Sequence, residues 1–214
     1  ASAWRKWLLR AVAGAPAQMQ IMYGVAGERN LLEWQVPWLS GYEGSTPVRI
    51  GNAAAEQVQL DVYGEVADAI LQARKGGLPP HHRERELAAA ILPFLEKIWV
   101  EPDEGIWEVR GQRQHFTYSK VMAWVAFDRA VQIAEADGEP EAAARWRTLA
   151  DHIHAEVCEK AFDPELGCFV QAYGSKRLDA SLLLIPMVGF LPPEDPRVRG
   201  TLQAIEERLL IDGE

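Results

Sequence analysis

Hydrophobic residues recur three or four positions apart along most of the chain, which is the spacing of one face of a helix. Clusters of Gly and Pro interrupt this pattern and separate its segments. The predicted helices cover residues 2–13, 53–75, 84–100, 140–160, 179–185 and 195–210, and a further helix begins at 117 or 119 and runs to 137–138. Alternation typical of strands is not clear anywhere, although short strands could form within residues 168–172. The chain is therefore predicted to be all-α, with six or seven helices.

Three residues decide where these helices begin or are interrupted. Asn52 can cap the helix predicted over 53–75, because its side chain can accept a hydrogen bond from a free backbone N–H. Pro140 stands in the first turn of its helix, where proline is tolerated. Pro93 falls inside the predicted helix 84–100, where it favours a kink or a break.

The connections between the predicted helices alternate in length. The turn at 137–140 is short, whereas residues 17–51 and 103–116 form long connections that contain Trp, Tyr and Gly. Long ordered connections are usually functional, and this alternation is typical of a barrel of helix pairs with tight turns at one end. No internal repeat of roughly 20–50 residues is present, which disfavours a solenoid.

Composition and charge restrict the possible partners. The 214 residues, 48% of them hydrophobic and 25% charged, suit one large domain or two small ones of an ordinary globular protein. A net charge of −9 argues against nucleic acid and anionic membranes as partners. No apolar run reaches the roughly 18 residues of a membrane-spanning helix. Cys158 and Cys168 are expected to be free, which favours a reducing cytoplasm.

Residues 103–120 combine acidic, aromatic and basic side chains in one predicted loop. A loop that only joins two helices needs neither Trp107 nor the adjacent Glu108, and Arg110 and His115 follow closely. Aromatic rings stack on the apolar faces of sugars. A carboxyl beside a Trp is partly desolvated, which favours its protonated form and suits a general acid. The loop therefore predicts a sugar-cleaving site.

This loop and its neighbours resemble bacterial members of glycoside hydrolase family 15, the relatives of glucoamylase, glucodextranase and trehalase. The resemblance rests on Gly-Ile-Trp-Glu-Val-Arg-Gly at 105–111 and on further motifs at 20–24, 47–54, 59–65, 115–130 and 178–183. It covers nearly the whole chain. It implies an (α/α)6 toroid of twelve helices, of which this chain would be about half. Residues 1–214 are then expected to form a single, partial catalytic domain that lacks the N- and C-terminal portions of the toroid.

The resemblance also implies roles for residues of the motif. The Glu that follows the Trp is the general acid of the family, which places Glu108 in that role and Trp107 in the adjacent sugar subsite. Arg110 is a candidate substrate contact without a more specific role. The general base of the family is a Glu near the end of the toroid, outside this chain. Because inversion requires both carboxyls, the 214-residue chain alone is predicted to be inactive.

Several residues outside the motif have two interpretations. Tyr23 could be a sugar platform, or it could pack the first long connection onto the helices, and the same alternatives hold for Trp34 and Trp38. Asp179 precedes a predicted helix, so it could cap that helix or contact the substrate.

The remaining acidic residues and the histidines are given structural interpretations first. Asp61 is expected mid-helix, where it could cap, pair with Arg49 or contact the ligand. Asp103 and Glu104 are expected to belong to a solvated acidic loop. The histidines lack the spacing of a metal site, so neither a metal nor another cofactor is expected.

Three functions remain open from the sequence. The first is an inverting, exo-acting hydrolase of α-linked glucosides of the glucoamylase type, with a trehalase of the same family as its alternative. The second is a helical carbohydrate-binding domain without catalysis, and the third is a helical scaffold without a ligand. The expected partner is an α-glucoside or oligosaccharide. The exposed helix faces of half a toroid would also favour a homo-oligomer.

Overall fold

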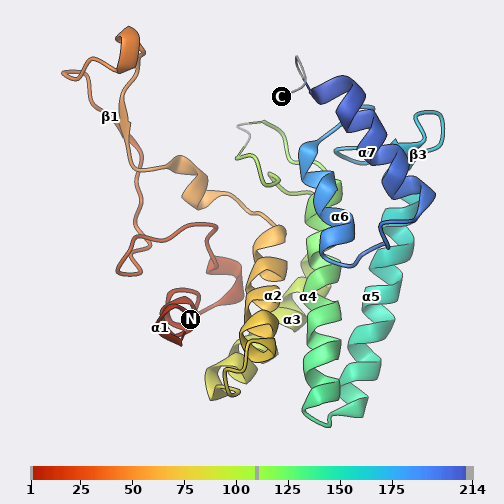
Figure 1. Ribbon diagram of the computed structural model, residues 1–214. Helices are drawn as coiled ribbons and strands as arrows, with labels where there is room; N and C mark the ends of the chain where they lie inside the picture. Colours follow the sequence, from red (N-terminus) through yellow and green to blue (C-terminus); the bar gives the residue numbers. More distant parts are fainter. Residues whose placement is uncertain (1, 109–110, 211–214) are drawn as a thin grey trace. The chain divides into compact units, whose positions relative to one another are not determined.

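The computed structural model describes residues 2–108 and 111–210, which divide into two compact units, Ala1–Val58 and Gln59–Glu214 (Figure 1). We call them the N-terminal unit and the helical unit and describe each by itself. Helices dominate the described residues, and their strands are only two residues long, so the prediction of an all-α fold is confirmed. The expectation of a single domain over 1–214 stays a prediction.

The N-terminal unit begins with a helix and continues in short, mostly irregular segments. Its elements are α1 (Ser2–Ala11), η1 (Pro16–Gln18), β1 (Trp34–Gln35), η2 (Tyr42–Gly44), β2 (Arg49–Ile50) and η3 (Ala53–Glu56). Strands β1 and β2 pair antiparallel, with Trp34 opposite Ile50. Arg29 donates to the carbonyl oxygens of Ala11 (3.0 Å) and Ala13 at the end of α1. A cation at the C-terminus of a helix satisfies carbonyls that have no partner within the helix.

The prediction of one helix over 53–75 is wrong for residues 57–60, which separate a short turn from α2. Asn52 does cap as expected, because its side chain accepts the Ala54 N–H at 2.9 Å, but the turn that it starts ends at Glu56. Gln57 is extended, and helix α2 begins only at Asp61. Asp61 is thus the first residue of a helix rather than a mid-helix residue.

The helical unit contains the long helices of the chain. Its elements are α2 (Asp61–Lys75), α3 (His82–Ile98), α4 (Thr117–Ala136), α5 (Pro140–Lys160), β3 (Phe162–Asp163), β4 (Cys168–Phe169), η4 (Ala180–Leu183), α6 (Leu184–Met187) and α7 (Pro196–Leu209). Helix α4 packs between α2 and α5, and α7 packs on β4 and η4 (Figure 1). Strands β3 and β4 pair antiparallel, which agrees with short strands near residue 168. Helix α3 continues through Pro93 without a break.

The core of the helical unit lies around α4. Val121, Val125 and Phe127 have no solvent exposure, as expected for a helix that is covered by two neighbours. Helix α2 approaches α4 very closely at Gly64, where a Cβ atom would lie 2.2 Å from the carbonyl oxygen of Met122. Only glycine fits this contact, so Gly64 sets the distance between the two helices.

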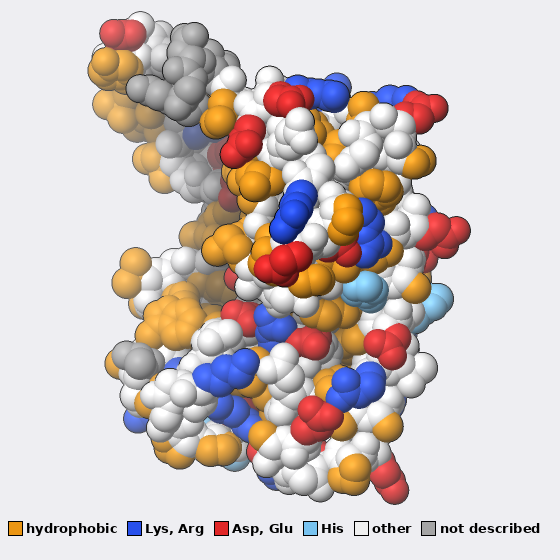
Figure 2. All heavy atoms as spheres, turned by 45° about the vertical axis from the view of Figure 1, so that its right-hand side comes forward, with side chains coloured by type: hydrophobic (Ala, Val, Ile, Leu, Met, Phe, Trp, Pro, Cys, Tyr) orange, Lys and Arg blue, Asp and Glu red, His pale blue; other side chains and the backbone are white. Residues whose placement is uncertain are grey.

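The surface mixes polar and apolar side chains, and the two cysteines are free. Figure 2 shows hydrophobic side chains interspersed with Lys, Arg, Asp and Glu on the face that it presents. Within residues 2–108 and 111–210, no helix is both long and apolar enough to cross a bilayer. Cys158 and Cys168 are free, as predicted. The expected homo-oligomer stays a prediction.

Candidate active site

The connection between α3 and α4 is a loop with a fixed base, which we call the acid loop (residues 103–114). Asp103 and Gln114 form an antiparallel bridge, in which each backbone N–H donates to the other's carbonyl oxygen at 3.0 and 2.9 Å. Just beyond it, the backbone N–H of Thr117 donates to Gln171 O at 2.9 Å. Because both ends of the loop are hydrogen-bonded to neighbouring backbone, its tip projects from a defined position.

Buried charged side chains hold the base of the acid loop. Asp103 has no solvent exposure, and its Oδ2 accepts the backbone N–H of Leu60 at 2.9 Å. Lys120 is equally buried, and its Nζ donates to the carbonyl oxygens of Glu101 (2.6 Å) and Trp99. The prediction that Asp103 belongs to a solvated acidic loop is therefore wrong. Its carboxylate instead connects the loop to the start of α2.

Burial shifts the pKa values of these charged groups. It raises the pKa of Asp103, against the hydrogen bond from Leu60, and lowers the pKa of Lys120 to about 8, against the attraction of Asp103. The pKa of Asp61 is raised to about 7, first by burial and then by the charge of Asp103. Arg49 belongs to the N-terminal unit, where its guanidinium contacts Glu33 at 3.3 Å, and its pairing with Asp61 stays a prediction. The base of the acid loop therefore lies among ionisable groups whose pKa values are shifted by burial.

The tip of the acid loop presents Glu108 to solvent. Glu108 is exposed, which contradicts the expected partial desolvation of its carboxyl beside Trp107. Its backbone has a φ of 52°, in the left-handed region that costs a non-glycine residue about 1–2 kcal/mol. Such a conformation persists only where surrounding contacts fix it. Ile106, two residues before Glu108, supplies one of these contacts, since it packs against the buried cluster of Tyr118, Met122 and Val125.

Trp107 is fixed by Asp179 across the helical unit. Trp107 is 56% exposed, yet its Nε1–H lies 2.9 Å from both carboxylate oxygens of Asp179. Asp179 is buried and also accepts the backbone N–H of Ser181 at 2.8 Å and the Nε2–H of Gln171 at 3.0 Å. The predicted cap is confirmed, because Asp179 is the N-cap residue of η4. Its contact with the substrate stays a prediction.

The space beneath Trp107 is narrow. A cavity of about 10 Å³ lies between the acid loop, the start of α4 and η4, and it is lined by Trp107, Phe116, Tyr118 and Asp179 among others. It has room for about one water molecule and is too small for a glucose ring. Gly105 closes it on one side, where a Cβ atom would lie 2.7 Å from the ring of Phe116.

The other predicted site residues belong to the N-terminal unit or lie outside the described residues. Tyr23 belongs to the N-terminal unit, where its hydroxyl accepts the Gln20 N–H at 2.9 Å and Arg29 lies over its ring at 5.7 Å. Its role as a sugar platform stays a prediction. Arg110 lies outside the described residues. Trp34 and Trp38 are exposed, with ring centroids 5.9 Å apart.

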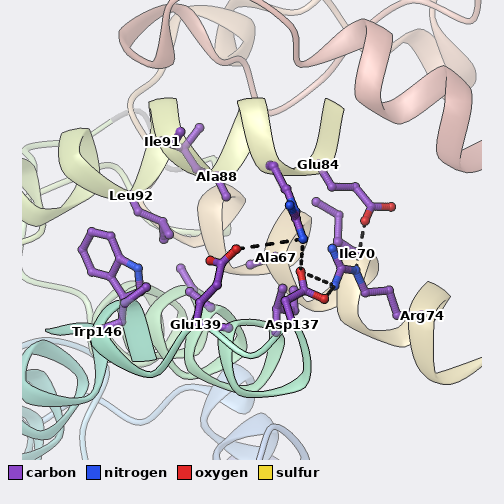
Figure 3. A pocket seen from close by; sticks show the side chains of 17 residues that line it. Ala67, Ile70, Arg74, Glu84, Ala88, Ile91, Leu92, Asp137, Glu139 and Trp146 are labelled. Atoms are coloured by element: carbon purple, nitrogen blue, oxygen red, sulfur yellow. Dashed lines mark hydrogen bonds and ion pairs between the residues drawn. The ribbon is translucent and has the colours of Figure 1, made fainter. Parts of the chain in front are cut away.

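A larger cavity of about 340 Å³ lies elsewhere, among α2, α3, α4 and α5 (Figure 3). Its walls are largely apolar and include Trp146. At its rim Arg74 forms ion pairs of 3.0 Å with Glu84 and with Asp137. This cavity adjoins the C-terminal part of α4, whereas the acid loop joins its N-terminus, so it is separate from Glu108. In the described ranges, no group of three or more His, Cys, Asp or Glu is arranged to hold a metal ion.

Comparison with known proteins assigns the fold and its motif to a family. The family model described as "Glycosyl hydrolases family 15" matches residues 1–214, and the chain belongs to this family. The chain is 48% identical to a trehalase of Mycobacterium tuberculosis over 91% of its length and 46% identical to one of Mycolicibacterium smegmatis, also over 91%. A trehalase of Thermoplasma volcanium is 41% identical over 87% of the chain. The chain spans 28%, 29% and 30% of these three relatives.

Solved structures support the architecture. A glycosidase structure aligns with 99% of this chain and 56% of its own length, with a TM-score of 0.70 and 21% identity. A glucoamylase from Saccharomycopsis fibuligera aligns with 75% of this chain and 41% of its own, with a TM-score of 0.59 and 14% identity. The helices of this chain are therefore part, about half, of an (α/α)6 toroid.

Proposed function

We propose that this chain supplies the general acid of an inverting glycoside hydrolase that cleaves trehalose. The observation that carries the proposal is that relatives at 34–48% identity are all named trehalase and align with 87–92% of this chain. These relatives favour the trehalase alternative over the glucoamylase type that the sequence placed first.

The proposed chemistry requires two carboxyls on opposite faces of the scissile bond, about 6.5–9.5 Å apart. Glu108 donates its proton to the oxygen that joins the two glucose units of trehalose, and the bond from that oxygen to one anomeric carbon breaks. A water molecule, deprotonated by the second carboxylate, adds to this carbon from the opposite face. One glucose is then released as the β-anomer, and the other keeps its α-configuration. We place the second carboxylate outside this chain, because the resemblance to the family implies a general base near the end of the toroid.

The geometry of the acid loop supports Glu108 in this role. Glu108 is exposed at the tip of a loop whose base is fixed, so a sugar can reach it without displacing the core. Trp107 beside it presents a ring that is 56% exposed and is already oriented by Asp179. An oriented, half-exposed aromatic ring is a suitable stacking surface for a glucose unit.

The experiment compares the full-length product of the source gene with its Glu108→Gln variant on trehalose, maltose and isomaltose. We expect trehalose to be the preferred substrate and the variant to lose about 10²–10⁴-fold in kcat, the usual contribution of a general acid. Glu101→Gln is the matched control, because it removes an exposed carboxyl from the same connection, and it should retain activity. A Glu108→Gln variant as active as the wild type would refute the assignment, and a preference for maltose would return the substrate to the glucoamylase type.

A second test concerns the 214-residue chain alone. Because the base is proposed to lie outside it, this polypeptide should release no glucose from trehalose even at high protein concentration. Turnover by the purified chain would place both carboxyls within it and would contradict the proposal.

A further inference from the structure

The conformation of Glu108 depends on its neighbour. Its φ of 52° is unfavourable for a residue with a Cβ atom, so contacts of adjacent residues must hold it. Trp107 is the adjacent residue, and its indole N–H is 2.9 Å from each oxygen of the Asp179 carboxylate. This hydrogen bond joins parts of the chain 72 residues apart and fixes the loop next to Glu108.

We propose that Asp179 is a positioning residue, which orients the acid Glu108 by holding Trp107 and does not itself bind the sugar. The inference rests on the proposed role of Glu108 as general acid. It assigns to Asp179 a function that neither helix capping nor substrate contact requires. A displacement of a catalytic group by about 1 Å can cost about a hundredfold in rate, so a single hydrogen bond at this place affects catalysis strongly.

The hydrogen bonds of Asp179 leave little capacity for a ligand. A carboxylate offers about four lone-pair sites. Oδ1 accepts from Trp107 and from the backbone N–H of Ser181, and Oδ2 accepts from Trp107 and from Gln171. The residue is also buried, with 6% exposure. Three donors from three segments of the chain thus bind the same carboxylate. This arrangement holds the segments together and leaves no oxygen lone pair for a sugar hydroxyl.

The test uses Asp179→Asn and Trp107→Phe in the full-length protein. The amide of Asn keeps one acceptor oxygen and replaces the other with an NH2 donor, which weakens the contact that the indole N–H makes with both oxygens. Phe keeps an aromatic ring but removes the Nε1–H donor. Each variant should lower kcat on trehalose about tenfold to a hundredfold with a smaller change in KM. The double variant should be no worse than the poorer single variant, because both substitutions act on the same hydrogen bond.

The decisive readout is a second substrate, α-glucosyl fluoride. Its fluoride leaves without needing a proton, so a misplaced general acid slows its hydrolysis much less than that of trehalose. We expect Asp179→Asn to be defective on trehalose and nearly normal on the fluoride, and Trp107→Phe to lose more activity on trehalose than on the fluoride. Equal defects on both substrates would mean that Asp179 binds the sugar or only supports folding, and the inference would be wrong. Unchanged kcat on trehalose would also overturn it.

Two controls separate this inference from the proposed function. Asp163→Asn alters an Asp that accepts the backbone N–H groups of Glu165 (2.8 Å) and Leu166 (3.0 Å) in a distant turn, and it should behave as the wild type on both substrates. Glu108→Gln is assayed in parallel. If it is fully active, or if the wild type does not cleave trehalose, the proposed function fails. If Glu108→Gln is inactive on trehalose but Asp179→Asn is normal, only the role of Asp179 fails. Should Asp179→Asn not fold, Trp107→Phe decides by the ratio of its defects on the two substrates, since a lost stacking contact slows both equally and a misplaced acid slows mainly trehalose.

Discussion

Replacing Asp61 with Asn should stabilise the protein, and the gain should grow as the pH rises from 5 to 8. Asp61 is 6% exposed, and among the described residues its Oδ1 has no hydrogen-bond partner. Its pKa is about 7 in the folded chain, against an ordinary value of 3.8. The folded state therefore binds more protons than the unfolded state between these values, so ionisation of Asp61 removes stability as the pH rises through about 7.

The size of the effect follows from this pKa. A difference of about three pH units corresponds to about 4 kcal/mol of unfolding free energy lost at pH 8, and to about 1.5 kcal/mol at pH 5. Asn resembles the neutral acid in shape and carries no charge, so Asp61→Asn should recover an amount of this order.

Urea denaturation of the full-length protein at pH 5 and pH 8 measures the difference. Asp151→Asn is the control, because Asp151 is exposed on α5, and it should change stability little at either pH. If Asp61→Asn lowered stability at pH 8, the ionised carboxylate would make a stabilising contact and the reasoning would be refuted.

Three further predictions concern packing and buried charge. Gly64→Ala should lower the unfolding free energy by about 1–3 kcal/mol, measured by urea denaturation, because the new Cβ meets the carbonyl oxygen of Met122; a variant as stable as the wild type would show that α2 and α4 can separate freely. Lys120→Met should cost about 3–5 kcal/mol in the same assay, since it leaves Asp103 buried without its cation, and Asp103→Asn in the same chain should restore part of the loss. Gly105→Ala should lower both the melting temperature and the kcat on trehalose, because its φ of 71° and the ring of Phe116 exclude a side chain; normal kinetics would mean that the loop adapts.

Periodicity and local capping signals predicted most helices well. The boundaries of α4 and α5 agree with the prediction to within two residues, since they are set by turn residues and, for α5, by a proline in the first turn. The cap at Asp179 was also predictable, because a capping side chain acts on the backbone two residues away. Local signals suffice where the interaction that fixes the structure is itself local.

Long-range interactions account for what the sequence did not predict. Asn52 carries a real capping signal, yet the start of α2 is set where Leu60 donates to Asp103, which lies 43 residues away. For the same reason Asp103 resembles a solvated loop residue in the sequence and is fully buried in the structure. The bond between Trp107 and Asp179 spans 72 residues, so no local pattern indicates it. The one available signal was that polar residues beside the motif, Asp103 and Lys120 among them, are more numerous than a connecting loop needs.

The most direct test of the central claim is proton NMR of the glucose anomers formed from trehalose by the full-length protein, recorded before mutarotation and repeated with Glu108→Gln. An inverting trehalase that uses Glu108 as its acid predicts equal initial amounts of α- and β-glucose from the wild type and almost none from the variant. Initial release of α-glucose alone, or an unimpaired Glu108→Gln variant, would contradict the account.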